Sequence, residues 1–258
     1  RTSGNGAGAR QPGRRRPQAP RRHPVLRFLG WTVALSGTLV VSGALVGIVA
    51  YEVASSRLPP LTSLTDYKPK LPMQVFSADG LLIGEYGSEK RTVVSYSSFP
   101  EKMRQAILAA EDDDFFTHHG IDLFGVGRAV LANVKKGGRG QGASTITMQL
   151  ARTTFLSRER SFVRKFYEVL LTLRIEQQLS KSQIFEIYAN QIFLGQRSYG
   201  FATAAQTYFG KPLSELTIGQ MAMLAGLPKA PARDNPIANP ERAKQRQRYV
   251  LSRMRTLG

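Results

Sequence analysis

The sequence predicts a mainly α-helical domain that follows a small β hairpin and, before the hairpin, a helix long enough to cross a membrane. Three observations support this fold class: an uncharged apolar run near the N-terminus, two short alternating segments around one turn, and helical spacing of apolar residues after position 100. Because 42% of the 258 residues are apolar and 21% are charged, the chain can bury a sizeable core, and wholesale disorder is excluded.

The N-terminal segment joins a basic tail to the candidate membrane span. Residues 1–27 contain eight arginines and no acid among many Gly, Pro and Gln residues, which predicts a disordered tail. The next 24 residues, 28–51, carry no charge and reach about 36 Å as a helix, enough to cross a bilayer core. Buried core helices are rarely this long without a charge, and signal peptides have shorter apolar regions. The arginine excess before the span predicts a cytoplasmic tail and an exported remainder.

The charge balance and the residue content restrict the function classes. Thirty-six basic against 18 acidic residues give a net charge of +18, which favours an anionic partner such as nucleic acid, lipid headgroups or a phosphorylated ligand. The strongest basic run is the tail, which lies across the membrane from the folded part, so no nucleic-acid partner is expected. The absence of cysteine excludes a disulfide framework, a zinc–thiolate site and a thiol nucleophile.

The exported part begins with a linker and a hairpin. Four prolines, at positions 59, 60, 69 and 72, predict an extended linker over residues 52–72. Residues 74–86, QVFSADGLLIGEY, form two short apolar runs on either side of Asp79 and Gly80, which predicts two strands joined by a turn. We assign residues 73–258 to one domain, in which strand signals nearly vanish after the hairpin.

Capping residues mark four helix starts: a proline suited to a first helical position, two capping boxes and an Asn-Pro pair. These are Pro100, Ser180 with Gln183, Thr217 with Gln220, and Asn239 with Pro240. Gly195 is the expected end of the helix that begins after Ser180. Because the chain stops at the end of the last helix, the natural protein is expected to continue.

The most unusual stretch is an acidic cluster, Glu111 to Asp114, inside a basic protein. Neighbouring carboxylates repel and raise one another's proton affinity, so a cation, a helix N-terminus or a function must compensate. The cluster fits either a solvated turn that ends a helix or a general base, because Phe115 and Phe116 are expected to be buried beside it. Two histidines follow, but no spaced ligand set supports a zinc site.

Two further segments fit either a plain structural role or ligand binding. Residues 137–152, GGRGQGASTITMQLAR, could surround an anion or a sugar hydroxyl, or form a flexible surface loop before a short helix. On a predicted helix, Arg160, Arg164 and Glu168 lie four residues apart on one stripe. That stripe fits an intrahelical ion pair, or a cationic row that binds phosphate oxygens while Glu168 faces the reacting atoms.

Five motifs in order make the chain resemble glycosyltransferase family 51, the peptidoglycan glycosyltransferases of class A penicillin-binding proteins and their monofunctional relatives. The motifs are EDxxFFxHxG from position 111, GASTITMQ from 142, RKxxE from 164, KSQIFEIYAN from 181, and AAQTYFGKPLSELT to LAGLPKAP over 204–231. The resemblance covers roughly residues 73–258. Met148, Ala189 and Gln220 depart from the common pattern, and none of these changes a charged residue that is a catalytic candidate.

The resemblance implies a lysozyme-like fold set partly in the outer leaflet, and the polymerisation of lipid II. In that reaction the 4-hydroxyl of an acceptor sugar attacks the anomeric carbon of a growing chain and expels undecaprenyl pyrophosphate with inversion. The resemblance implies Glu111 as the general base and Glu168 as a second carboxylate at the leaving pyrophosphate, and it leaves open an Mg²⁺ or Mn²⁺ ion near either one. The implied substrate-binding residues are Asp112, Phe116, His118, Ser144, Thr145, Gln149, Arg152, Arg160, Arg164, Lys165 and Asn190.

Some of these side chains also fit supporting roles. His118 is expected to be a satisfied structural histidine, and Asn190 and Glu186 are expected to hold the cleft together. The last helix resembles the connection into a transpeptidase domain, which predicts a truncated bifunctional enzyme.

The implied partners are lipid II, the growing glycan and membrane lipids, at the bacterial cytoplasmic membrane. Cell wall synthesis proteins and self-association are further candidates. Two other functions stay open: a lysozyme-like hydrolase or lytic transglycosylase, which cleaves finished glycan, and a non-catalytic scaffold that binds lipid II. The cationic row around Arg164 argues against the first, and retention of both glutamates argues against the second.

Overall fold

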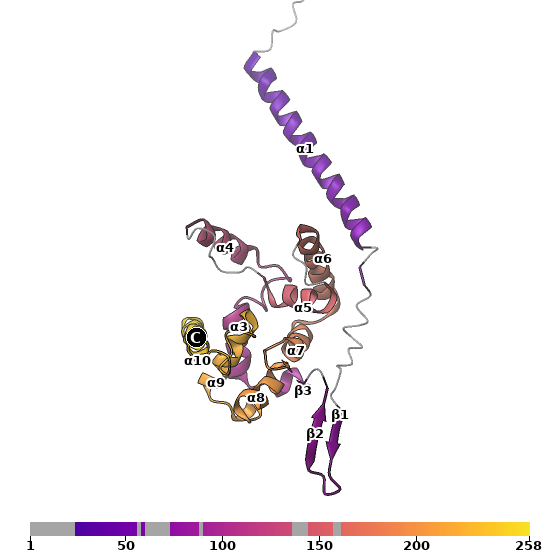
Figure 1. The fold of residues 1–258 in the computed structure, drawn as a ribbon. Coiled ribbons are helices and arrows are strands. Elements are labelled where there is room, and N and C mark those ends of the chain that lie inside the picture. Colours follow the sequence, from indigo (N-terminus) through magenta and orange to yellow (C-terminus); the bar gives the residue numbers. More distant parts are fainter. Residues whose placement is uncertain (1–23, 56–57, 60–72, 88–89, 136–143, 157–160) are drawn as a thin grey trace, which may run out of the picture. The chain divides into compact units, whose positions relative to one another are not determined.

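The computed structural model describes residues 24–55, 58–59, 73–87, 90–135, 144–156 and 161–258 (Figure 1). The chain forms two compact units, residues 1–53 and 54–258. The predicted tail, apart from residues 24–27, and most of the predicted linker lie outside the described residues.

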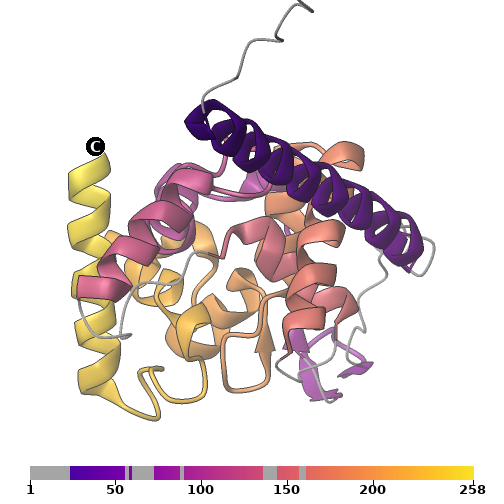
Figure 2. The same ribbon diagram turned by 90° about the horizontal axis from the view of Figure 1, so that it is seen from above.

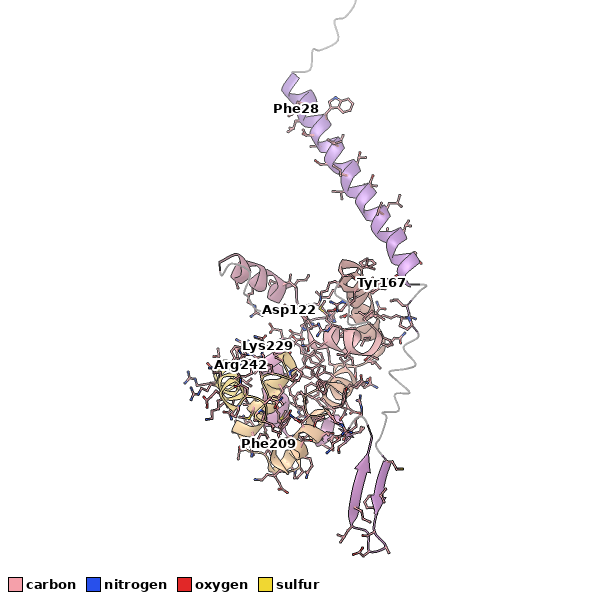
Figure 3. The ribbon with its side chains drawn as sticks, viewed as in Figure 1. Phe28, Asp122, Tyr167, Phe209, Lys229 and Arg242 are labelled. Carbon is pink, nitrogen blue, oxygen red and sulfur yellow. The ribbon has the colours of Figure 1, made fainter. Side chains whose placement is uncertain are left out.

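The first unit is a single apolar helix, α1 (Pro24–Ser55). Its segment Phe28–Val49 is long and apolar enough to cross a membrane, and none of it is buried inside the structure. Large apolar side chains are exposed along its length, beginning with Phe28, which Figure 3 labels. In a helix the backbone N–H and C=O groups bond to one another, and a helix that is apolar on every side is compatible with the apolar interior of a bilayer. The helix predicted over residues 28–51 is therefore present, with a few more residues at each end.

The predicted hairpin is confirmed. Strands β1 (Met73–Phe76) and β2 (Leu82–Tyr86) pair antiparallel with Met73 opposite Tyr86. Gly80 adopts a positive φ of 81° in the turn between them. A residue without a Cβ takes this conformation at no steric cost, which is why the turn falls at the Asp-Gly pair.

The rest of the second unit is mainly helical, as predicted (Figure 1). Its helices and 3₁₀ turns are η1 (Tyr96–Ser98), α3 (Glu101–Glu111), α4 (Leu123–Lys135), α5 (Ile146–Phe155), α6 (Phe162–Gln178), α7 (Lys181–Gln191), α8 (Phe201–Phe209), η2 (Leu213–Glu215), α9 (Ile218–Ala225), η3 (Leu227–Lys229) and α10 (Pro240–Leu257). Two short strands, β3 (Lys90–Arg91) and β4 (Ser198–Tyr199), pair in parallel and join segments about a hundred residues apart.

Two helix groups share one core. Helices α3, α9 and α10 pack against one another, and α5 packs against α6 and α7. Figure 2 shows α10, in yellow, at one edge of this unit. One hydrophobic cluster includes residues of both groups and of the loop after α3, among them the fully buried Ile107, Phe115, Leu150 and Tyr188. The core therefore fixes the C-terminus of α3, where the acidic cluster lies, relative to α5 and α7.

The capping residues mark the helix starts closely. Both predicted capping boxes form, at Ser180 and at Thr217. The side chain of Asn239 accepts from the backbone of α10, and Pro240 occupies the first turn of that helix. Pro100 is the residue before α3 rather than its first residue, an offset of one position.

The predicted end of α7 at Gly195 is wrong. The helix ends at Gln191, because Ile192 turns to extended backbone after its amide bonds to the Tyr188 carbonyl. Phe193, two residues before the glycine, then forms a bridge with Tyr199, so strand-like pairing replaces the helix before Gly195 is reached. Gly195 instead occupies the following turn with a φ of 87°.

Candidate active site

A cavity of about 850 Å³ opens at the C-terminus of α3. Glu111, Gln149 and Arg152 line it from α3 and α5. Residues of η3, of the loop after it and of α10 also line it. Ser144, from the segment before α5, also contributes to the wall. The cavity therefore brings the first two sequence motifs together with the C-terminal third of the chain.

Glu111 is the last residue of α3, and its side chain is half-buried at the wall of the cavity. Its Oε2 accepts a hydrogen bond from Nε2 of Gln149 at 2.7 Å. Its Oε1 is buried and has no hydrogen-bond partner within the described residues. Burial raises the pKa of Glu111, while the Gln149 hydrogen bond and then the charges of Arg246, Lys229 and Arg152 lower it. One carboxylate oxygen is thus held and the other is available to accept a proton.

Asp112 and His118 form a buried polar link behind this site. Nε2 of His118 lies 2.9 Å and 3.1 Å from the two Asp112 oxygens, and its Nδ1 accepts from the Gly120 amide. The proton of the imidazole therefore belongs on Nε2, from which it is donated to Asp112. Asp112 also accepts from the Ile146 amide, and Thr145 donates to the Gly120 carbonyl. These contacts join the loop after α3 to the start of α5.

Asp112→Asn is expected to destabilise the unit by about 1–3 kcal/mol. An asparagine at this position keeps only one accepting oxygen, and its amide would face either the Ile146 N–H or the protonated Nε2 of His118. His118 cannot change tautomer without losing the Gly120 hydrogen bond. Urea unfolding measures the change. The matched control is Asp79→Asn in the exposed hairpin turn, which is expected to cost under about 0.5 kcal/mol, and equal costs for the two variants would contradict the assignment.

Two members of the predicted cationic row, Arg164 and Lys165, lie on α6 and contact Glu168. Glu168 is fully buried, and its two oxygens face Nζ of Lys165 at 2.6 Å and Nη1 of Arg164 at 3.5 Å. Ser161 caps the start of the helix by accepting from the Arg164 amide. Arg160 lies outside the described residues. The intrahelical ion pair considered from the sequence is therefore present, together with a second cation.

The described residues provide no preformed cluster of ligands for the Mg²⁺ or Mn²⁺ ion considered from the sequence. No group of three or more His, Asp or Glu side chains in the described part of the chain is arranged to hold a metal. Both oxygens of Glu168 already face cationic side chains, which a second cation would have to displace.

Two other predicted residues lie elsewhere. Phe116 is 48% exposed and packs edge-on against Phe115, so the expected burial holds for Phe115 alone. The side-chain amide of Asn190 donates to the Val94 and Glu186 carbonyls and accepts from the Val94 amide. Asn190 therefore ties α7 to the segment before η1, and Glu186 adds a hydrogen bond from the Tyr96 amide.

The residues that line the cavity from the C-terminal third of the chain were not identified as functional from the sequence. Lys229 lies in the LPKAP part of the fifth motif, and from the sequence the last helix is expected only to connect to a transpeptidase domain. The five cations of the wall are Arg152, Lys229, Arg233, Arg242 and Arg246, against the two acids Glu111 and Asp234. Lys229 and Arg242, which Figure 3 labels, both line the cavity. The cavity therefore carries a net charge of about +3 when every group is ionised.

Close packing holds the Arg246 side chain in place. Its Nε donates to the Gly226 carbonyl at 3.3 Å, and its guanidinium lies over the Tyr249 ring, 4.4 Å from the centroid. A Cβ at Gly226 would lie 2.6 Å from Cγ of Arg246, so the glycine is required by space rather than by its ordinary φ of −79°. The only sequence signal for this residue is a glycine followed, twenty positions later, by an arginine.

Comparisons with known proteins show the family of the chain. The family model described as transglycosylase matches residues 79–255. The chain is 53% identical to penicillin-binding protein 1A of Neisseria flavescens over 230 residues, which cover 89% of this chain and 29% of that protein. It is 45% identical to penicillin-binding protein 1A of Pseudomonas aeruginosa over 234 residues, 91% of this chain and 28% of that protein.

A crystal structure of penicillin-binding protein 1A from Haemophilus influenzae is also similar, with 34% sequence identity and a TM-score of 0.39. The match covers 72% of this chain and 18% of that chain. The chain thus spans less than a third of the length of these curated relatives.

Proposed function

Because the chain belongs to the transglycosylase family, we propose that it is a peptidoglycan glycosyltransferase that polymerises lipid II during cell wall synthesis. One structural observation supports the proposed reaction. A half-buried glutamate with one unpartnered oxygen lines a cavity whose other charged residues are mostly cations. That combination suits the activation of a sugar hydroxyl beside a substrate that carries phosphate charge.

Glu111 is the general base in this proposal. Its free Oε1 takes the proton of the acceptor's 4-hydroxyl as that oxygen attacks the anomeric carbon, while Gln149 holds Oε2. The bond from the anomeric carbon to the pyrophosphate oxygen breaks, and the leaving group departs with the electron pair. A base whose pKa is raised toward neutrality by burial transfers the proton more effectively than an ordinary glutamate.

The cations stabilise the negative charge that develops on the leaving group. Arg152, Lys229 and Arg246 lie on different elements of the cavity wall, so a bound phosphate group meets several fixed donors. On α6, Arg164 and Lys165 are proposed to contact substrate phosphate as well, with Glu168 orienting both through its ion pairs. Asp112, His118, Thr145 and Asn190 then support the site through the contacts described above.

The membrane placement follows from the substrate. The chain is membrane-anchored through α1, as its apolar helix and its relatives indicate. We propose that the arginine-rich end is cytoplasmic and that the unit from residue 54 faces the opposite side of the cytoplasmic membrane. There the enzyme meets lipid II by diffusion within the same bilayer.

The test of the proposal uses the detergent-solubilised chain and purified lipid II, with glycan length followed on a gel. The expected result is glycan many disaccharides long, together with release of undecaprenyl pyrophosphate. A lysozyme-like hydrolase or lytic transglycosylase would leave lipid II unpolymerised and shorten finished glycan. A scaffold would bind lipid II and convert neither substrate. Either of these two results with a folded protein would overturn the proposal.

A further inference from the structure

We propose that Tyr188 is a positioning residue for this reaction. Its buried hydroxyl fixes the side-chain amide of Gln149, so that the amide nitrogen faces Glu111 and one carboxylate oxygen stays free. The inference rests on the proposed function, because it assigns Glu111 the role of general base.

Two successive hydrogen bonds connect three helices, α7, α5 and α3. Tyr188 lies on α7 and is 1% exposed, and its hydroxyl donates to Oε1 of Gln149 over 3.4 Å. Gln149 lies on α5 and is 7% exposed, and its Nε2 donates to Oε2 of Glu111 at the end of α3 over 2.7 Å. These two hydrogen bonds therefore connect the buried Tyr188 hydroxyl to Glu111 at the cavity through the single side-chain amide of Gln149.

The chemistry of the three groups allows one arrangement of that amide. An ionised carboxylate only accepts hydrogen bonds, whereas an amide has a donor end and an acceptor end. If the amide of Gln149 turned over, its oxygen would face the Glu111 carboxylate and its NH₂ would face the Tyr188 hydroxyl. The phenol then has to accept rather than donate, and two acceptors meet at Glu111. Tyr188 thus stabilises the orientation that holds the base.

The charges around Glu111 do not depend on the Tyr188 hydroxyl. They come from Arg152 on α5, Lys229 in η3 and Arg246 on α10, with Asp112 next in the chain. Burial and then the Glu111 charge raise the pKa of Tyr188 well above 10, so the phenol stays protonated wherever the enzyme works. Tyr188→Phe therefore removes one donor while leaving the ring and every neighbouring charge in place.

The test is steady-state polymerisation by Tyr188→Phe across a range of pH. Because the Gln149 amide loses its hydrogen bond from Tyr188 in the variant, it is held less rigidly against Glu111, and kcat is expected to fall roughly five- to tenfold with little change in KM. The loss of a steady hydrogen bond to the carboxylate raises the pKa of Glu111 further. The acid limb of kcat/KM should therefore move to higher pH, by about 0.5 units.

The matched control is Tyr208→Phe, which also removes a tyrosine hydroxyl, here a half-buried one that donates to the Leu194 carbonyl over 2.8 Å. Tyr208 has no contact with Gln149 or Glu111, so its variant should keep the wild-type pH profile. A second comparison places Tyr188→Phe in a Gln149→Leu background, where it should have no further effect on the pH profile. An unchanged acid limb in Tyr188→Phe, or effects that add in the double variant, would overturn the inference.

A readout without substrate separates this inference from the proposed function. The pKa of Glu111 is obtained from the pH dependence of unfolding, by comparing the wild type and Tyr188→Phe each with its Glu111→Gln counterpart. A higher Glu111 pKa in the Tyr188→Phe series supports the inference even if lipid II is not polymerised. Equal Glu111 pKa values in the two series would overturn it.

Discussion

Replacing Glu111 with glutamine is expected to reduce the rate of lipid II polymerisation by roughly 10²- to 10⁴-fold. The amide keeps the size of the carboxylate and can still accept from Nε2 of Gln149, but it cannot take the proton of the attacking hydroxyl. Binding of lipid II should change little, because the cations of the cavity wall remain. Single-turnover polymerisation, with lipid II binding measured separately, checks the prediction.

The same substitution is expected to stabilise the fold at neutral pH. Burial raises the pKa of Glu111 in the folded chain above its unfolded value, so the folded state disfavours the charged form. Below the unfolded pKa the carboxyl group is neutral in both states and costs the folded state little free energy. As pH rises through the folded pKa, the group becomes charged, and its free-energy cost to the folded state grows. Glu111→Gln should therefore have a higher Tm than the wild type at pH 7 and an equal Tm near pH 4. The activity of the wild type should fall as pH drops through that raised pKa.

The control for both measurements is Glu215→Gln, which changes an exposed glutamate in η2 outside the cavity wall. This variant should retain wild-type polymerisation and show no pH-dependent gain in Tm. If Glu111→Gln polymerises lipid II at the wild-type rate, the base is another group and the proposed chemistry is wrong.

Replacing Gly195 with alanine is expected to destabilise the second unit by about 3 kcal/mol or more. The residue has a φ of 87°, and a Cβ there would lie 2.5 Å from the Pro231 carbonyl oxygen and 2.7 Å from the Tyr208 hydroxyl. The carbonyl belongs to backbone, which cannot move aside as a flexible side chain could. Pro231 lies between Lys229 and Arg233 of the cavity wall, so polymerisation should weaken together with stability. Urea unfolding and the lipid II assay measure the two effects.

Gly210→Ala is the matched control for Gly195→Ala. Gly210 also has a positive φ, 64°, but a Cβ there would meet nothing within 4 Å. Alanine at this position is expected to lower stability only through backbone strain, by about 1 kcal/mol, and to leave polymerisation unchanged. Similar losses of stability in the two variants would show that the contact with Pro231 is not what constrains Gly195.

Features that depend on near neighbours in the chain could be predicted from the sequence. The Asp79-Gly80 turn, the capping boxes at Ser180 and Thr217, and the uncharged run before residue 52 each depend on residues within one element. Glu111 could be selected in the same way, because an acidic cluster beside two phenylalanines is unusual in a basic chain. The motif order then identified the family without any long-range contact.

Functional geometry that depends on distant residues could not be predicted. Oε2 of Glu111 is held by a residue 38 positions away, and the cavity opposite it is closed by Lys229 and Arg246, more than a hundred positions away. The buried link from Asp112 to His118 and Ile146 likewise spans two loops.

Periodicity and capping determined which segments become helices and where most of them begin, because those preferences are set within a few residues. Only the tertiary structure decided which oxygen of Glu111 is free, which cations face it and where α7 ends. Those outcomes depend on burial and on hydrogen-bond partners that the packed core supplies.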